Sequence, residues 1–424
     1  MLKRLLALPL FRTAGLYTIG NLMNAAIPFF LIPIMTRYLS AEAYGTIAMY
    51  AVIQGIVAPL VGMSSHSTIQ KRYFDQDRFD FAKYLGNCLI ILMVSTGVVL
   101  VLFTVFQSFL FSYTLLSSKW LFSVVGITFC MFLTQCSLYI WQVSQKPIQY
   151  VTFLISMSAL NFLLSVFFVV RLGEDWQGRI TAQLLTSAVF ALLSLYMLWK
   201  KGLIKIEYDK EYIKDIARLS FPLIPHSLAA LLFAMTDRIV LTNLSGLERT
   251  GVYSVAYQLG SLMMILTSSF NSAYVPWLFK QLKEGSHQMK LKIVKLTYAY
   301  FILIWVLAGF IMLSLKWVIP YLVGPNFMQS ADYIVWIISG FAFNGMYLMI
   351  TNYIFYAEKT YYLAIATVCI TLFNIGLCYT LVKLNGPIGA AQSSAISYFF
   401  YFILSSYFCT KSYPMPWNLK TKHV

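Results

Sequence analysis

Long stretches without a charged residue restrict what this chain can fold into. A helix needs about 20 mostly apolar residues to cross a bilayer. Twelve runs of this kind occur, and in one of them, 219–243, only Asp237 and Arg238 interrupt the apolar sequence. The other eleven are 13–36, 43–65, 84–118, 120–145, 147–170, 180–199, 250–279, 296–315, 333–357, 361–382 and 384–410. The sequence therefore predicts an all-α integral membrane protein with twelve transmembrane helices.

The composition supports this prediction and excludes soluble classes of protein. Of the 424 residues, 59% are hydrophobic and 11% are charged, and the mean hydropathy is +0.73. A water-soluble globule of this size would need more polar surface, so soluble enzymes and disordered regulators are excluded. The six cysteines have no C-x-x-C spacing, and no phosphate loop, metal cluster or nucleophile motif occurs. We expect no cofactor, no metal and no enzymatic activity.

The distribution of basic residues predicts the orientation in the membrane. The chain has 31 Lys and Arg against 15 Asp and Glu, a formal net charge of +16. In a soluble protein this excess would indicate nucleic acid, but here 23 of the 31 fall at the termini and in loops on their side of the predicted spans. Because Lys and Arg collect in cytoplasmic loops, we expect both termini in the cytoplasm and no nucleic-acid partner.

The two halves of the chain show a weak internal repeat. At an offset of 206, three residues of the first half match three of the second, namely Thr36, Glu42 and Gly45 with Thr242, Glu248 and Gly251. Two lobes of six helices would share one orientation and form a site between them, around a central cavity. We therefore expect an N-terminal lobe at 1–200, a basic cytoplasmic linker at 201–218, a C-terminal lobe at 219–410 and a cytoplasmic tail at 411–424.

Charged residues within the predicted spans are candidates for function. By these span limits, Asp237 is the only acid inside a span and Arg238 the only base, while Arg37 follows the first span. Charges at membrane depth tend to face a cavity or a partner, although a long side chain near the membrane edge can also reach water. Because the two residues are about 100° apart around a helix, Asp237 need not neutralise Arg238 and is free to bind a coupling cation.

Uncharged polar residues also recur at helical spacing. Asn21 and Asn24 lie in the first span, and Gln258 lies in the eighth. Such faces avoid lipid because unpaired amides are costly in hydrocarbon. They could form hydrogen bonds between helices, but several stripes in a two-lobed protein favour a water-filled central cavity.

Several short strings carry a family resemblance. They are FPLIPHS at 221–227, TDR at 236–238, GVYSVAY at 251–257, PW at 276–277, TRYL at 36–39 followed by Glu42 and Tyr44-Gly45, and RYF at 72–74. These strings resemble the bacterial O-antigen and polysaccharide flippase family of the multidrug, oligosaccharidyl-lipid and polysaccharide exporter superfamily. With the span count and the two halves, the resemblance covers essentially the whole chain.

The resemblance implies a flippase in the bacterial inner membrane. Such a protein moves undecaprenyl-diphosphate-linked oligosaccharide, an O-antigen or similar repeat unit, by alternating access coupled to a gradient of H⁺ or Na⁺. Other polysaccharide assembly proteins are expected partners. Related flippases place several basic residues in the cavity, and this sequence offers few. We therefore expect Asp237 to couple the ion and the substrate to contact Asn21, Asn24, Arg37, Arg72, Arg218, Arg238 and Gln258.

Three other functions remain open at this point. A multidrug or cation antiporter of the same superfamily would favour acids in the cavity, and only Asp237 is available. A membrane-embedded polysaccharide polymerase or glycosyltransferase usually has a sizeable catalytic loop, whereas the longest loops between the predicted spans have about 20 residues. A purely structural scaffold would have the same composition.

Overall fold

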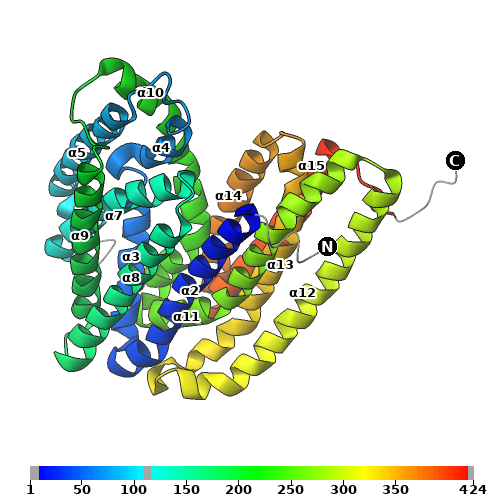
Figure 1. The fold of residues 1–424 in the computed structure, drawn as a ribbon. Coiled ribbons are helices and arrows are strands. Elements are labelled where there is room, and N and C mark those ends of the chain that lie inside the picture. The colour runs from blue at the N-terminus through cyan, green and yellow to red at the C-terminus, as the bar shows by residue number, and fades with distance from the viewer. Residues whose placement is uncertain (1–8, 109–115, 419–424) are drawn as a thin grey trace. The chain divides into compact units, whose positions relative to one another are not determined.

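The computed structural model describes residues 9–108 and 116–418. Over these residues the chain consists of helices, turns and irregular segments without a β-strand. It divides into two compact units, Met1–Leu231 and Leu232–Val424, and Figure 1 shows each of them as a bundle of long helices. The predicted all-α fold class is confirmed.

Up to α10, the described part of the first unit contains eight α-helices and two short segments of other helix types. In it α2 packs against α8, and both α7 and α8 pack against α9. The elements are α2 (Pro9–Tyr38), α3 (Ala41–Val57), the 3₁₀-helix η1 (Val61–Ser64), α4 (His66–Arg72), α5 (Phe81–Val105), α7 (Ser118–Val143), α8 (Pro147–Val166), the π-helix η2 (Phe167–Arg171), α9 (Trp176–Lys200) and α10 (Lys210–Ser220).

The second unit begins within the long helix α11, whose residues up to Leu231 belong to the first unit. Its helix α15 packs against both α13 and α14. The elements are α11 (Leu223–Glu284), α12 (His287–Leu322), the 3₁₀-helix η3 (Pro325–Ser330), α13 (Ala331–Tyr356), α14 (Tyr361–Asn385) and α15 (Ile388–Ser412).

Helix α11 contains two of the predicted spans. It is interrupted at Gly246, whose φ of 86° and ψ of 171° are not helical. Glycine tolerates this positive φ because it has no Cβ. Across the interruption the Oγ1 atoms of Thr242 and Thr250 are 2.9 Å apart and form a hydrogen bond. Gly246 therefore divides α11 between the predicted spans 219–243 and 250–279.

Eight helical segments of the described chain are long and apolar enough to cross a membrane. The number rises to nine if Ala41–Val57 and Val61–Arg72, which are bent by 65°, form one broken span. One of the eight, Lys210–Lys283, carries both predicted spans of α11. The protein is thus a multi-pass membrane protein, and the count of twelve spans remains a prediction.

Helix α5 shows how the apolar runs relate to the membrane. The run 84–118 predicted one long helix, but α5 ends at Val105, and residues 109–115 lie outside the described part. Its 25 residues already extend about 37 Å, more than the roughly 30 Å of a hydrocarbon core. Val94, Val98 and Val101 are each more than half exposed, and such an apolar face fits lipid better than water.

The segment 201–218, predicted to be a linker, packs on the first turns of α5. Lys205 N donates to Ala82 O at 3.1 Å. A Cβ on Gly86 would lie 2.0 Å from Lys205 O, so only glycine permits this close approach of the two backbones. The linker is therefore held against α5 by a backbone hydrogen bond and a close backbone approach.

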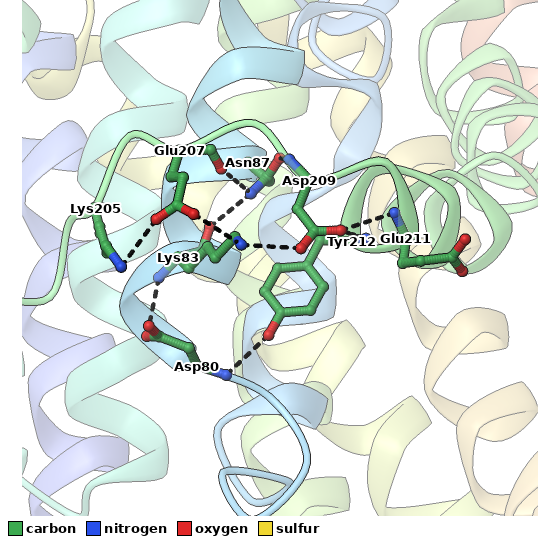
Figure 2. A network of polar contacts seen from close by, with 8 residues as sticks. All are labelled: Asp80, Lys83, Asn87, Lys205, Glu207, Asp209, Glu211 and Tyr212. Carbon is green, nitrogen blue, oxygen red and sulfur yellow. Dashed lines mark hydrogen bonds and ion pairs between the residues drawn. The ribbon is translucent and has the colours of Figure 1, made fainter.

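Polar side chains reinforce this contact, as Figure 2 shows. Lys83 Nζ lies 3.1 Å from Glu207 Oε1 and 3.0 Å from Asp209 Oδ2. The amide of Asn87 donates to Glu207 O and accepts from Asp209 N. Lys205 and then Lys83 lower the pKa of Glu207, and Lys83 lowers the pKa of Asp209. Both carboxylates therefore remain ionised at neutral pH and hold the linker.

Gly86→Ala is expected to detach the linker from α5. The added methyl group would overlap Lys205 O, and overpacking of this kind costs about 1–3 kcal/mol. The measurement is hydrogen–deuterium exchange of the 203–209 amides together with thermal unfolding of the purified protein. Gly97→Ala in the same helix is the control, because a Cβ there meets no atom within 4 Å. Equal exchange in the two variants would show that Gly86 has no such role.

Candidate functional site

The charged pair of α11 is buried within the second unit. Asp237 is 4% exposed and Arg238 is 7% exposed. Arg238 Nη1 lies 3.0 Å from Asp237 Oδ1 and also donates to Ala234 O at 3.1 Å. The expectation that Asp237 stays free of Arg238 is wrong. The angle between the two residues separates their Cα–Cβ bonds, but the long arginine side chain folds back along the helix and reaches the carboxylate.

Two tyrosines on the second part of α11 complete this group. The Tyr253 hydroxyl donates a hydrogen bond to Asp237 Oδ2, and Arg238 Cζ lies 4.1 Å from the centroid of the Tyr257 ring. Such a cation–π contact stabilises a desolvated guanidinium. Both oxygens of Asp237 therefore have partners, and these contacts place Arg238 in a packed interior position. A cation could bind Asp237 only by sharing or replacing one of the partners.

Helix α2 of the first unit carries three of the residues predicted to contact the substrate. Asn21 accepts a hydrogen bond from the Tyr150 hydroxyl at 3.4 Å, and Asn24 accepts one from the Ser158 hydroxyl. Both donors lie on α8, so these contacts join two helices, as the alternative explanation of the polar stripes predicted. Arg37 is exposed in the last turn of α2.

Two of the basic residues predicted for the substrate path, Arg72 and Arg218, lie at or beside helix α10. Of these two, Arg72 binds carboxylates. Arg72 binds Asp215 of α10 through Nε at 2.9 Å and Nη2 at 2.5 Å, and its Nη1 lies 2.7 Å from Asp75 Oδ2. The planar guanidinium thus makes a bidentate pair with one carboxylate and a single contact with another. Arg72 is positioned to hold α10, whereas Arg218 at the end of α10 is exposed. Gln258 on α11 is partly exposed.

The sequence analysis missed one basic residue within an apolar helix. Arg179 was placed just outside the span 180–199, but α9 begins at Trp176 and so includes it. Its Nη1 donates to Asn161 Oδ1 at 2.9 Å and to Ser165 Oγ at 3.1 Å, both on α8. Arg179 therefore joins Arg238 as a basic residue of a span-length helix whose guanidinium contacts polar groups of the protein. The apolar run begins at residue 180, so it could not show that the helix starts four residues earlier, at Trp176.

Arg179 lines a cavity of about 210 Å³ within the first unit. The cavity also touches Pro28 and Leu31 of α2, Ser158 of α8 and Gln183 of α9. Gln183 Nε2 donates to Gln54 Oε1 of α3 at 3.0 Å. Amides, hydroxyls and one guanidinium thus line one part of this space, and the rest of its wall is apolar.

A family model and a relative of known sequence both match most of this chain. The model of the family described as "Polysaccharide biosynthesis protein" matches residues 10–282. An uncharacterized membrane protein of Haemophilus influenzae is 25% identical over 376 residues, which cover 87% of this chain and 89% of that protein.

Two solved structures share the fold of this chain. The lipid II flippase MurJ in an inward closed conformation has a TM-score of 0.74 at 15% identity, over 93% of this chain and 87% of that one. An inward-facing multidrug resistance MATE family transporter of the MOP superfamily has a TM-score of 0.72 at 16% identity, over 93% of this chain and 94% of that one. At these identities the likeness shows the fold alone.

Proposed function

The chain belongs to the polysaccharide biosynthesis protein family, and we propose that it is a flippase that moves lipid-diphosphate-linked oligosaccharide across a membrane. The observation that carries this proposal is the buried group of Asp237, Arg238 and Tyr253 in an apolar helix. Charged groups at membrane depth are costly and characteristically mark the path of a transported molecule or ion. In a family associated with polysaccharide synthesis, a lipid-linked glycan is the transported molecule that such a group fits best.

The chemistry of the proposed substrate matches the polar residues described above. A lipid diphosphate is an anion joined to a polar glycan, so its carrier needs cations, hydroxyls and amides. Arg72 supports the path indirectly, because its charge is already paired with two carboxylates. We propose that the substrate path includes Asn21, Asn24, Arg37, Arg218, Arg238 and Gln258.

The transport cycle is proposed to be alternating access between the lobes at 1–200 and 219–410. A gradient of H⁺ or Na⁺ would drive it, with Asp237 as the coupling group. The proposed topology places both termini and the tail at 411–424 in the bacterial cytoplasm. Residues 1–8 and 419–424 lie outside the described part. An O-antigen or similar repeat unit is the proposed substrate, delivered and consumed by other polysaccharide assembly proteins.

A multidrug antiporter is the main rival, because a MATE transporter shares the fold. An antiporter that binds organic cations needs an acid that can face its substrate. The carboxylate of Asp237 is instead bound to Arg238 and Tyr253. This pairing favours the flippase over the antiporter.

The two functions are separated by complementation. Expression of the chain in a bacterium that lacks its own O-antigen flippase is expected to restore surface polysaccharide, measured per molecule of membrane-inserted protein. In the same cells the minimal inhibitory concentrations of cationic drugs are expected to stay unchanged. Drug resistance without restored polysaccharide would favour the antiporter. A polymerase would instead change the length of the polysaccharide chains in a strain that keeps its flippase.

A further inference from the structure

The cavity beside Arg179 lies entirely within the first unit and is large enough to hold a ligand. A buried site needs roughly 10–15 Å³ to hold one water molecule, and this one measures about 210 Å³. Its walls come from α2, α7, α8 and α9. The space can therefore hold a small solvated ion or one charged group of a larger molecule.

The charge of Arg179 is not balanced by a carboxylate. The hydrogen-bond acceptors of its guanidinium are the amide oxygen of Asn161 and the hydroxyl of Ser165, which are both neutral. The ion pairs found among the described residues do not include Arg179, whereas Arg72 and Arg238 each bind a carboxylate at 3.0 Å or less. Arginine stays protonated in proteins. Arg179 is only partly exposed. A cation between apolar helices without a counter-charge is unfavourable, and an anion in the cavity would lower this cost.

A second residue of the cavity wall has a buried hydroxyl group that lacks a hydrogen-bond partner among the described residues. Thr186 lines the same cavity and is 3% exposed. Its Oγ1 is buried without a hydrogen-bond partner in the described part of the chain. Leaving a buried hydroxyl unsatisfied costs about 1–3 kcal/mol. A ligand in the cavity that accepts a hydrogen bond would satisfy it.

We propose that this cavity binds a compact anionic group, with Arg179 as its counter-charge. The Thr186 hydroxyl lies about 10 Å further along α9 and would donate to it through a water molecule or a second oxygen of the ligand. Chloride, phosphate, and the carboxylate or phosphate group of an acidic sugar share this chemistry.

Anion-dependent stability of the purified full-length protein tests the site. Thermal unfolding is followed while the sodium salt of a bulky sulfonate buffer is replaced by chloride or phosphate at constant ionic strength. The wild type is expected to show saturable stabilisation. The apparent affinity is expected to fall at least about tenfold in Arg179→Gln, because the charge-assisted hydrogen bond is lost, and several-fold in Thr186→Val. Arg171→Gln is the control, since Arg171 is an exposed base in η2.

The source of the anion is resolved by adding glucuronate and glucose 1-phosphate. Binding about tenfold tighter than that of the inorganic ions, and lost in Arg179→Gln, assigns the site to a charged group of the substrate; this assignment rests on the proposed function. Equal or weaker binding assigns it to a free inorganic ion.

Two outcomes would overturn the proposal. One is the absence of saturable, anion-specific stabilisation in the wild type. The other is unchanged affinity in both Arg179→Gln and Thr186→Val. If Arg179→Gln does not fold, Thr186→Val and Arg179→Lys carry the test. Restored surface polysaccharide in a protein that binds no anion would separate failure of this site from failure of the flippase function.

Discussion

Arg238→Ala is expected to be strongly destabilising, because it leaves the carboxylate of Asp237 buried without its counter-charge. Asp237→Asn should have a similar effect, since it leaves the guanidinium beside the Tyr253 and Tyr257 rings without an anion. Breaking a buried ion pair from one side costs about 3–5 kcal/mol. The measurements are the amount of protein in the membrane fraction and the thermal unfolding of purified protein.

The double variant Asp237→Asn/Arg238→Gln is expected to be more stable than either single variant. It removes both charges at once, and replacing a whole buried pair by neutral groups is often close to neutral in free energy. Arg249→Gln serves as the control because Arg249, on the same helix, binds the neutral side chain of Gln329. A double variant whose loss equals the sum of the two single losses would contradict mutual neutralisation.

The same double variant distinguishes a role in transport from a role in stability. If Arg238 or Asp237 contacts a substrate or an ion, the double variant should fold and yet restore little surface polysaccharide per inserted molecule. If the pair only stabilises the second unit, transport per molecule should recover together with stability. Normal transport in the stable double variant would remove both residues from the proposed path.

The sequence was sufficient to predict the all-α fold class because the bilayer imposes one requirement on every span. A helix in lipid must be long and apolar, and these properties are local. The ends of the helices were less accessible, since they depend on capping groups and on where the backbone turns. The start of α9 at Trp176 shows the consequence, because four residues at its N-terminal end decided whether Arg179 was counted as part of the helix.

The contacts of the candidate residues could not be deduced from the sequence. The pairing of Asp237 with Arg238 depends on a side-chain conformation and on Tyr253, which is 16 residues further along and reaches Asp237 across the interruption at Gly246. The unpaired hydroxyl of Thr186 depends on the shape of a cavity. Spacing along one helix contains none of this information.

Arg72→Gln is expected to release α10 from α4 and α5. Arg72 makes the bidentate contact to Asp215, and Tyr84 OH donates a third hydrogen bond to this carboxylate at 3.1 Å. Hydrogen bonds to charged groups contribute about 1.5–3 kcal/mol each, and the side chains of Arg72 and Asp215 are only 14% and 22% exposed. The amides of Lys210–Ser220 should therefore exchange with deuterium much faster in the variant than in the wild type.

Lys83→Gln provides the comparison for Arg72→Gln, because it removes a more exposed contact to the same linker. Glu207, one of its partners, has a side chain that is 48% exposed, where water screens the charge, so α10 should exchange only slightly faster. The charge-swapped variant Arg72→Asp/Asp215→Arg should recover part of the protection lost in Arg72→Gln, since it restores opposite charges but not the original geometry.

If Arg72→Gln leaves the exchange of α10 unchanged and also lowers transport, the guanidinium acts on the substrate and not on the linker. Unchanged transport with a mobile α10 would instead show that the linker can detach without affecting the path.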